Sequence, residues 1–408
     1  MGTVSRMKKI KIGLTAFAFA VGLSGVHAQD AKVKIGVLTD MSSVYSDGSG
    51  EGSVEAARLA IEDAGDVLGH KVELVKADHQ HRADVGAGIA RRWYSNEGVD
   101  MITDVPNSAV GLAVAAVSNQ VHKPAILVGT LSVELTGAQC GPYTAAWSID
   151  TFSQAKVLGS AIVQSGGDSW FFIAANYAFG KSLVQQATAA IEASGGKVVG
   201  SVFAPLNASD FSSFLLQAQQ SKAKVIGLAT AGGDTVNALK QADEFGIRDG
   251  GQKLATFVIF ETDVKSLGLK TAQGLQLAAP FYWDLDDASR AFAKRFYEKM
   301  GRVPTLGQAS VYSAVAHYLK AIKAAGTKDP DVVMAKMREL PVNDFMTHNG
   351  RLRADGRLLR EMHLFEVKKP AESKGEWDLF RLVRTVPGEE AFRPLSEGHC
   401  PLVSENPK

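Results

Sequence analysis

Hydrophobic and polar positions along residues 32–128 follow two alternating periods. Short apolar runs rich in Val, Ile and Leu, typical of buried strands, alternate with stretches in which apolar residues recur every three to four positions. In the first such stretch these residues are Val54, Ala57, Ala60 and Ile61, the spacing of one helix face. The pattern predicts strands over 32–39, 70–77, 99–105 and 124–128, with helices over 53–63, 84–96 and 108–122.

A second series of the same kind begins at residue 170. It predicts strands over 170–175, 197–203, 224–229, 256–260, 274–279, 363–367 and 377–386, and helices over 180–193, 209–221, 235–245, 288–300, 308–325 and 330–340. Strands alternating with helices indicate mostly parallel sheets covered by helices, here in two α/β units. No low-complexity linker separates the units, so we expect a cleft between them, where the carboxyl ends of parallel strands can bind a small ligand.

Residues 1–28 are predicted to be a secretory signal peptide. Arg6, Lys8 and Lys9 precede an apolar run over 12–23, and Val26 to Ala28 has the small-residue pattern of a cleavage site. The run is short for a bilayer span, which takes about 20 residues. No cysteine follows it to carry a lipid anchor. We therefore expect an exported protein with no membrane insertion after the signal peptide is cleaved.

Charge and cysteine content narrow the function classes. The chain has 44 basic and 43 acidic residues, and without residues 1–28 the balance becomes 40 to 43. That balance lacks the basic surplus of a nucleic-acid-binding domain. Cys140 and Cys400 are the only cysteines. In an exported protein we favour a disulfide between them, and two unpaired thiols remain the alternative.

No catalytic signature stands out in the sequence. Phosphate-binding, zinc-protease and nucleophile-elbow motifs are missing, and the glycines between 48 and 52 lack the dinucleotide-binding spacing. His79 and His81 could contribute to a metal site, but a solvated loop at a strand end is the favoured interpretation. We expect no enzyme activity, no cofactor and no bound metal.

Several segments in order resemble a known family. They are the signal peptide, 34–41, 72–78, 104–108, 129–136, 176–180 and 207–212. The chain resembles the leucine/isoleucine/valine-binding family of periplasmic substrate-binding proteins over about residues 31–385, including branches that bind aromatic acids. The resemblance implies a type I periplasmic binding protein: two doubly wound, Rossmann-like lobes around a ligand cleft, joined by three hinge crossings. We expect lobe one at 31–148 plus 279–340, lobe two at 149–278 plus 341–390, and a C-terminal tail at 391–408.

The resemblance also implies ligand-binding residues in the first lobe. Tyr45 matches an aromatic residue that covers the pocket. Asn107 and Ser108 open a helix, where backbone N–H groups and the Ser hydroxyl can hold a carboxylate, because helix N-termini favour anions. In the loop that follows the next strand, backbone and hydroxyl contacts are expected from Gly129, Thr130 and Ser132.

From the second lobe, the resemblance implies aromatic contacts by Tyr177 and Phe179. Glu261 falls where amino-acid binders of this family place an acid against the ligand ammonium. At a lobe crossing, one of residues 281–283 is expected to reach the ligand, and Tyr282 is the candidate. The loop 230–234, which contains Gly232, departs from the family, because amino-acid binders often carry an aromatic residue in this loop and this chain has none there.

These features predict the solute-binding component of an ABC importer, which captures a small hydrophobic or aromatic carboxylate or amino acid and delivers it to a membrane permease. The open loop at Gly232 suits a flat ring, whereas Glu261 suits an ammonium or a hydroxyl, so both ligand classes stay open. A ligand-sensing receptor for a signalling partner is the alternative function. A periplasmic hydrolase is a third, although the sequence offers no nucleophile–base pair for it.

Overall fold

The computed structural model describes residues 1–4 and 32–403. The predicted signal peptide therefore lies outside the described residues apart from its first four. The compact unit that begins at Lys32 carries all the elements below. In the described part of the chain, no helix has the length and hydropathy that crossing a membrane requires.

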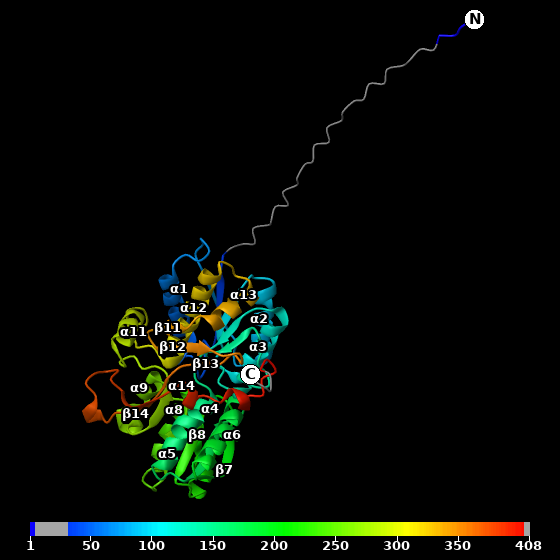
Figure 1. Cartoon of the computed structure of the whole chain (residues 1–408). Coiled ribbons are helices and arrows are strands. Elements are labelled where there is room, and N and C mark those ends of the chain that lie inside the picture. Colours follow the sequence, from blue (N-terminus) through cyan, green and yellow to red (C-terminus); the bar gives the residue numbers. More distant parts are fainter. Residues whose placement is uncertain (5–31, 404–408) are drawn as a thin grey trace. The chain divides into compact units, whose positions relative to one another are not determined.

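The first sheet contains five parallel strands in the order β2-β1-β3-β4-β5. Its two faces are covered by different helices (Figure 1). Ile35 and Val37 of β1 pack in a cluster with α1, whereas Leu38 packs in a separate cluster with residues of α2 and α3. The bounds are β1 Lys34–Thr39, β2 Glu73–Asp78, β3 Met101–Asp104, β4 Ala125–Leu127, β5 Thr144–Ala146, α1 Gly50–Ala64, α2 Ala83–Ser95 and α3 Ser108–Val121.

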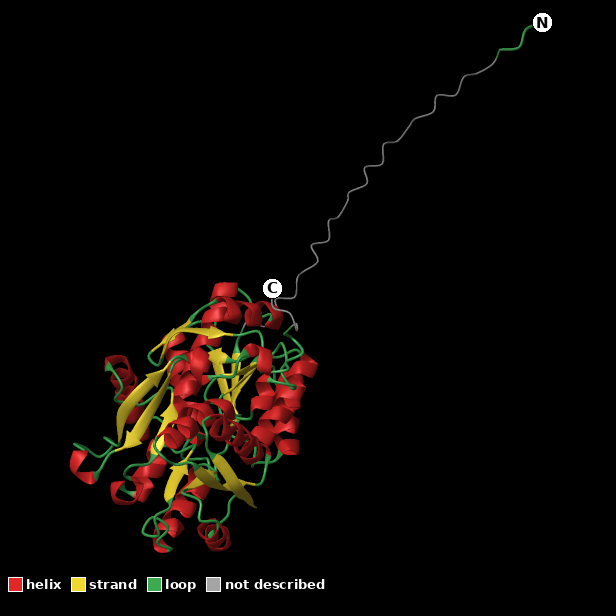
Figure 2. Cartoon of the chain, turned by 60° about the horizontal axis from the view of Figure 1, so that its bottom comes forward, coloured by secondary structure: helices red, strands yellow, loops and turns green. Residues whose placement is uncertain are grey.

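The second sheet contains four parallel strands in the order β7-β6-β8-β9. Every residue of β6 and β8 is buried, as expected for central strands with helices on both faces. Figure 2 shows helices flanking the strands of both sheets. The bounds are β6 Ser169–Ala175, β7 Lys197–Ala204, β8 Val225–Ala229, β9 Lys253–Thr256, α6 Ala178–Ala193, α7 Ser212–Gln220, α8 Gly232–Glu244, α9 Glu261–Leu267 and α10 Leu269–Ala272.

The remaining elements lie between and beside the two sheets. A small antiparallel sheet has the order β10-β14-β15, and a second has the order β11-β12-β13. Helix α12 packs against α1 and α13. The bounds are β10 Gln276–Ala279, β11 Val342–Asp344, β12 Thr347–Leu352, β13 Leu358–Leu359, β14 Met362–Val367, β15 Phe380–Val386, α11 Asp287–Met300, α12 Leu306–Ala325, α13 Pro330–Glu339 and α14 Gly388–Ala391.

Arg357 fixes the first passage of the chain between the sheets, at residues 147–150. Its guanidinium is 1% exposed, lies 3.2 Å from Asp150 and donates to the carbonyl oxygens of Ala146 and Ser148. Asp150 in turn caps α4 (Thr151–Gln154) by accepting from the Ser153 N–H at 2.7 Å. A π-helical turn, Ala155–Gly159, and α5, Ser160–Gln164, continue this helix toward β6.

The C-terminal segment is anchored on the first lobe, the part built around the first sheet. Phe392 is buried beneath the Arg357 guanidinium, and Arg393 donates to the carbonyl oxygen of Val133 at 3.1 Å. Cys140 and Cys400 form a disulfide, with Cα atoms 5.6 Å apart. The first part of the tail predicted at 391–408 is therefore anchored on the first lobe as far as Cys400.

Most predicted strands and helices are present, and the predicted α/β fold with parallel sheets is confirmed. One predicted strand is displaced: β9 covers Lys253–Thr256, whereas 257–260 leave the sheet as a buried irregular segment. The β11–β13 segment was not predicted. It pairs at Arg357 with Ala146 of β5 and bonds to α12 through Asp344 and Ser313, so its contacts are with the first lobe. The exact lobe boundaries stay a prediction.

Candidate ligand-binding site

A pocket lies where the carboxyl ends of strands from both sheets meet. About 550 Å³ of space in and at the mouth of the pocket, open solvent included, is not filled by protein atoms, and most of the side chains around it are apolar or aromatic. The second lobe, built around the second sheet, supplies one wall of it. The lining residues are Tyr45, Gly48, Ser49, Asp104, Pro106, Ser108, Val128, Gly129, Leu131, Ser148, Ile149, Tyr177, Phe179, Ala231, Val258, Phe260, Leu306 and Gly307.

Ser108 presents two polar donors at the start of α3. Its Oγ accepts from the Leu131 and Ser132 N–H groups, both at 3.2 Å. Within the described residues, neither its hydroxyl proton nor its own N–H has a protein acceptor. The first turn of α3 contains no acidic residue, so the positive end of the helix is not neutralised there. Ser108 can therefore donate twice to a carboxylate in the pocket.

Asn107 caps α3 rather than lining the pocket. Its Oδ1 accepts from the Ala109 and Val110 N–H groups at 2.9 and 3.1 Å. The amide nitrogen consequently faces Nδ1 of His81 at 3.2 Å, and Nε2 of His81 lies 2.8 Å from Asp40. This geometry requires Nδ1 to accept and Nε2 to donate. Asp40 also accepts from the N–H of Tyr45 at 2.8 Å, so one network supports both the Tyr45 loop and the start of α3.

Tyr45 and Tyr177 meet across the two lobes. Their hydroxyl oxygens are 2.8 Å apart. Burial, followed by the neighbouring Tyr177, raises the pKa of Tyr45 well above its ordinary value, and burial likewise raises the pKa of Tyr177. Both hydroxyls therefore stay protonated at neutral pH. The ring of Phe179 lies 5.9 Å from that of Tyr177 and extends the aromatic wall.

Gly232 lies at a second contact between the lobes. It starts α8 with φ +54°, and a Cβ at this position would lie 2.1 Å from the Val44 carbonyl oxygen. The next residue, Gly233, donates to that same oxygen at 2.9 Å. Gly232 is not a lining residue, although its neighbour Ala231 is. Its small size and left-handed backbone let the second lobe approach the Tyr45 loop.

Glu261 is buried next to the pocket but does not line it. It follows the lining residue Phe260 and is 2% exposed. Burial raises the pKa of its carboxyl to about 8; the charge of Asp263 adds to the rise and that of Arg302 opposes it. Burial, rather than either of these charges, therefore has the largest effect on the Glu261 carboxyl.

Of the other predicted residues, one lines the pocket and three do not. Gly129 lines the pocket and touches Pro106 closely, since a Cβ there would lie 2.3 Å from its Cα. Thr130 donates to the Val105 carbonyl oxygen at 3.1 Å, and Ser132 bonds to Glu134. Tyr282 donates to the Trp377 carbonyl oxygen at 3.0 Å, beside β15. These last three hydroxyls serve the fold, and none of the three residues lines the pocket.

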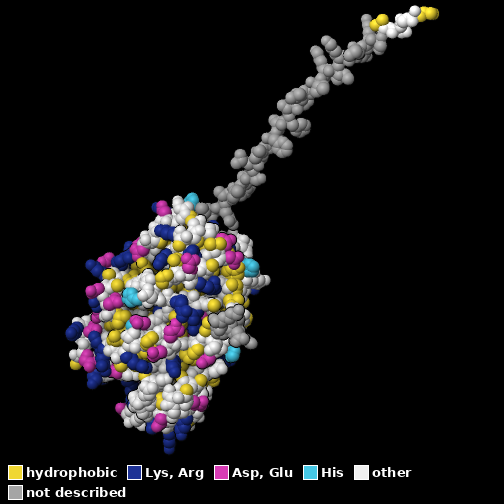
Figure 3. Space-filling view, in the orientation of Figure 1, with side chains coloured by type: hydrophobic (Ala, Val, Ile, Leu, Met, Phe, Trp, Pro, Cys, Tyr) yellow, Lys and Arg dark blue, Asp and Glu magenta, His cyan; other side chains and the backbone are white. Residues whose placement is uncertain are grey.

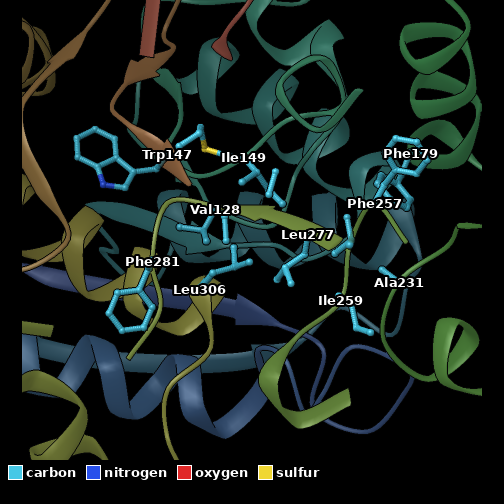
Figure 4. Packing of buried hydrophobic residues seen from close by; sticks show 14 of the residues in the cluster. Val128, Trp147, Ile149, Phe179, Ala231, Phe257, Ile259, Leu277, Phe281 and Leu306 are labelled. Atoms are coloured by element: carbon cyan, nitrogen blue, oxygen red, sulfur yellow. The ribbon is translucent and has the colours of Figure 1, made fainter. Parts of the chain in front are cut away.

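Sequence reasoning missed much of the apolar wall. Figure 4 shows Val128, Ile149 and Leu306 grouped near the centre of the view, with Phe179 and Ala231 to one side. Val128 and Ala231 follow β4 and β8, positions that the rule on strand ends could have indicated. Leu306 starts α12 and carries no such signal. Asp104 also lines the pocket, and the sequence analysis does not predict it as a site residue.

Metal binding was the remaining alternative for His79 and His81. In the described parts of the chain, no group of three or more His, Cys, Asp or Glu side chains is arranged to hold a metal ion. His79 is buried, its Nδ1 accepts from the His81 N–H at 3.1 Å, and burial lowers its pKa to about 4. Both rings therefore belong to the packed network beneath Tyr45.

Comparison with known proteins gives a consistent picture. A family described as periplasmic binding protein matches residues 32–376. A crystal structure of a periplasmic binding protein from Burkholderia mallei is 48% identical, with a TM-score of 0.90 over 91% of this chain and 99% of that one. A branched chain amino acid ABC transporter periplasmic ligand-binding protein from Burkholderia xenovorans LB400 is 43% identical, with a TM-score of 0.81 over the same shares. A Leu/Ile/Val-binding protein homolog from Brucella suis biovar 1 is 25% identical over 374 residues, covering 85% of this chain and 89% of that protein.

Proposed function

This chain belongs to the periplasmic binding protein family, of the branched-chain amino acid ABC transporter type, and from that premise we propose that it captures a small hydrophobic carboxylate between its lobes and delivers it to a membrane permease. The family binds solutes and is not an enzyme family. The ligand class proposed is an amino acid with an apolar side chain, or an aromatic acid.

The observation that carries this proposal is that one side of the pocket offers the two hydrogen-bond donors of Ser108, whereas the rest of its lining is mostly apolar. Ser108 offers an N–H and an O–H at the positive end of α3, which suits a carboxylate. The opposite wall, with Tyr177, Phe179 and Phe260, suits an apolar or aromatic body. Ligand pockets commonly combine a mostly apolar lining with a few fixed polar groups.

Binding is proposed to act by stabilising the closed arrangement. Contacts between Tyr45 and Tyr177, and between Val44 and Gly233, exist only when the lobes meet. A ligand that touches both walls gains its full contacts in that state alone, and differential affinity is what shifts such an equilibrium. The permease would then recognise the closed form. Export through a cleaved signal peptide would place the protein in the periplasm.

Basic and acidic side chains are intermixed on the face shown in Figure 3. Such a surface offers no extended field of one sign, in keeping with the sequence's formal net charge of +1. A small solute and a membrane permease are therefore the partners proposed, rather than a nucleic acid.

The test is a thermal-shift and calorimetric screen of the chain from Gln29 onward, prepared ligand-free. The panel contains leucine, isoleucine, valine, phenylalanine, benzoate, 4-hydroxybenzoate and coumarate. A true ligand at 100 times its Kd stabilises the protein by about 2.7 kcal/mol. Ser108→Ala should weaken its binding about 10- to 100-fold, because hydrogen bonds to a charged group are lost.

The matched control is Ser118→Ala, near the other end of α3. Ser118 is buried and bonds to the Lys123 carbonyl oxygen, so its loss should lower the melting temperature without changing affinity. A panel without any stabilising ligand would contradict the proposed ligand class. Unchanged binding by Ser108→Ala would contradict the proposal that Ser108 holds the carboxylate of the ligand.

A further inference from the structure

We propose that Asp104, and not Glu261, is the acid that receives a hydrogen-bond donor or cation of the ligand. The proposal rests on the proposed function, since it concerns the same pocket. Asp104 ends β3 and Ser108 begins α3 four residues later, and both line the pocket. Asp104 and Ser108 would thus each bind one of two polar groups of the same small molecule.

The carboxyl of Asp104 is buried without a full set of partners. The residue is 1% exposed, and its Oδ2 accepts no hydrogen bond from any residue that the structure describes. Burial raises the pKa of this carboxyl to about 6; the hydroxyls of Thr39 and Ser53 counteract the rise only in part, and the charge of Asp40 adds to it. An ionised carboxylate left in this state is costly unless a cation or a donor reaches it.

Asp40 shows what a satisfied carboxylate looks like in the same region. It is fully buried, yet it accepts from the N–H groups of Ser42, Ser43 and Tyr45 and contacts His81. Those bonds leave it with no need for an external partner. Asp104 has no comparable set among the described residues, although it lies closer to the pocket.

The backbone at Asp104 supports a special role for this position. Asp104 has φ +76° and Val105 has φ +55°, values that residues other than glycine rarely adopt. Two consecutive residues of this kind persist only where the surroundings hold them. Here the Asp104 carbonyl oxygen accepts from the Val128 and Gly129 N–H groups at 3.0 and 2.8 Å. These bonds fix the end of β3 against two residues that line the pocket.

This assignment selects between the ligand classes. An α-amino acid carries an ammonium beside its carboxylate, so Ser108 could hold the carboxylate while Asp104 meets the ammonium. A simple aromatic acid would bring a second carboxylate into an apolar pocket that already contains one, which electrostatics disfavours. We therefore expect a zwitterionic ligand, or one with a hydroxyl or amide donor near its carboxylate.

The experiment measures the coupling between residue 104 and the amino group of the ligand. Calorimetry compares leucine with 4-methylpentanoate, and phenylalanine with 3-phenylpropanoate, on the wild-type chain and on Asp104→Asn. Asparagine keeps the size of the side chain and tolerates positive φ. The wild type should prefer each amino acid over its deaminated analogue by about 10- to 100-fold, and Asp104→Asn should abolish most of that preference.

Two further variants keep the result interpretable. Asp100→Asn removes another buried acid, immediately before the other end of β3, where Asp100 accepts from the Lys34 N–H at 3.0 Å. It should lower the melting temperature and leave the preference intact. If Asp104→Asn does not fold, Glu261→Gln decides the question, because the proposal requires that it retain the preference.

The outcomes separate the two proposals. Binding of an amino acid with an unchanged preference in Asp104→Asn, or loss of the preference in Glu261→Gln, would overturn the assignment of Asp104 and leave the proposed function intact. Tighter binding of the deaminated acids by the wild type would do the same. No binding of any of the four compounds would overturn the ligand class, and the assignment with it.

Discussion

The hydroxyl groups of Tyr45 and Tyr177 share a hydrogen bond of 2.8 Å that joins the two lobes above the pocket. Tyr45 lies in the loop between β1 and α1, and Tyr177 precedes α6. The residues are 132 positions apart in the sequence and belong to different lobes. The bond therefore reports closure directly, and its loss should affect ligand release more than folding.

Tyr45→Phe and Tyr177→Phe should each weaken ligand binding about fivefold, because a neutral hydrogen bond contributes roughly 1 kcal/mol. Both hydroxyls serve one bond, so the double variant should bind no more weakly than either single variant. Stopped-flow measurement of the dissociation rate is the direct check. Multiplicative effects would mean that each hydroxyl contacts the ligand independently.

Tyr94→Phe provides the control for that cycle. Its hydroxyl donates to the Pro124 carbonyl oxygen at 2.8 Å, within the first lobe. This variant loses one buried hydrogen bond without altering the contact between lobes. We expect a lower melting temperature and an unchanged dissociation rate.

Gly232→Ala should block closure. The added Cβ would lie 2.1 Å from the Val44 carbonyl oxygen and 3.1 Å from the Tyr45 ring, and both of these belong to the other lobe. Opening the lobes relieves the clash, so we expect affinity to fall more than tenfold, while the positive φ costs about 1–2 kcal/mol of stability. Calorimetry and urea denaturation measure the two effects separately.

Gly301→Ala is the control for Gly232→Ala, because it introduces the same backbone strain without a clash against the other lobe. Gly301 ends α11 with φ +66°, and a Cβ there would meet no atom of the described residues within 4 Å. It should lower stability by a similar amount and leave affinity unchanged. An equal loss of affinity in both variants would argue against a steric effect at Gly232.

Glu261 should make stability fall as pH rises. Its pKa is raised from 4.5 to about 8 in the folded protein, so the folded state binds this proton more tightly than the unfolded state does. The contribution is fully present below about pH 4.5 and is lost as pH rises through about 8. In Glu261→Gln this group does not titrate. The free energy of unfolding of the variant, relative to that of the wild type, should therefore increase across this pH window by a few kcal/mol in total.

Urea denaturation at intervals of one pH unit from 5 to 9 checks that expectation. A difference between the variant and the wild type that does not change with pH would mean that Glu261 titrates normally. A difference that shrinks as pH rises would mean that the positive charge of Arg302 outweighs the effect of burial on the pKa of Glu261.

Arg357→Met should lower the free energy of unfolding by about 3–5 kcal/mol, because it leaves the carboxylate of Asp150 buried without its cation. Arg357→Lys should recover only part of this, since an ammonium cannot reach Asp150 and two carbonyl oxygens in the same planar geometry. Arg351→Met is the control, because the Arg351 pair with Glu389 is exposed and contributes little. Similar losses in Arg357→Met and Arg351→Met would contradict a special role for the buried pair.

The periodicity of the sequence was enough to predict the parallel sheets, because their central strands and covering helices repeat the same two patterns. It failed at 257–260, where Phe257, Val258 and Ile259 form an apolar run as continuous as a buried strand. These residues are buried at the end of β9 and between the lobes, and periodicity cannot distinguish that environment from the interior of a sheet.

The candidate site could be predicted only in part for a similar reason. Ser108 and Tyr177 lie where a strand gives way to the next helix, so the order of elements indicated their position. The backbone of Asp104 has a positive φ, and Leu306 belongs to a helix that is distant in the sequence. A pattern of hydrophobic and polar positions shows neither feature. The sequence also could not show that the hydroxyls of Thr130 and Tyr282 are already engaged by the protein.

The disulfide between Cys140 and Cys400 has a topological consequence. It closes a covalent ring of main chain whose ends are 260 residues apart, and the entire second lobe lies within that ring. A single protease cut in any loop of that lobe would therefore leave one covalently continuous molecule. On a denaturing gel the nicked protein would run as two fragments only after a thiol reductant had opened the ring.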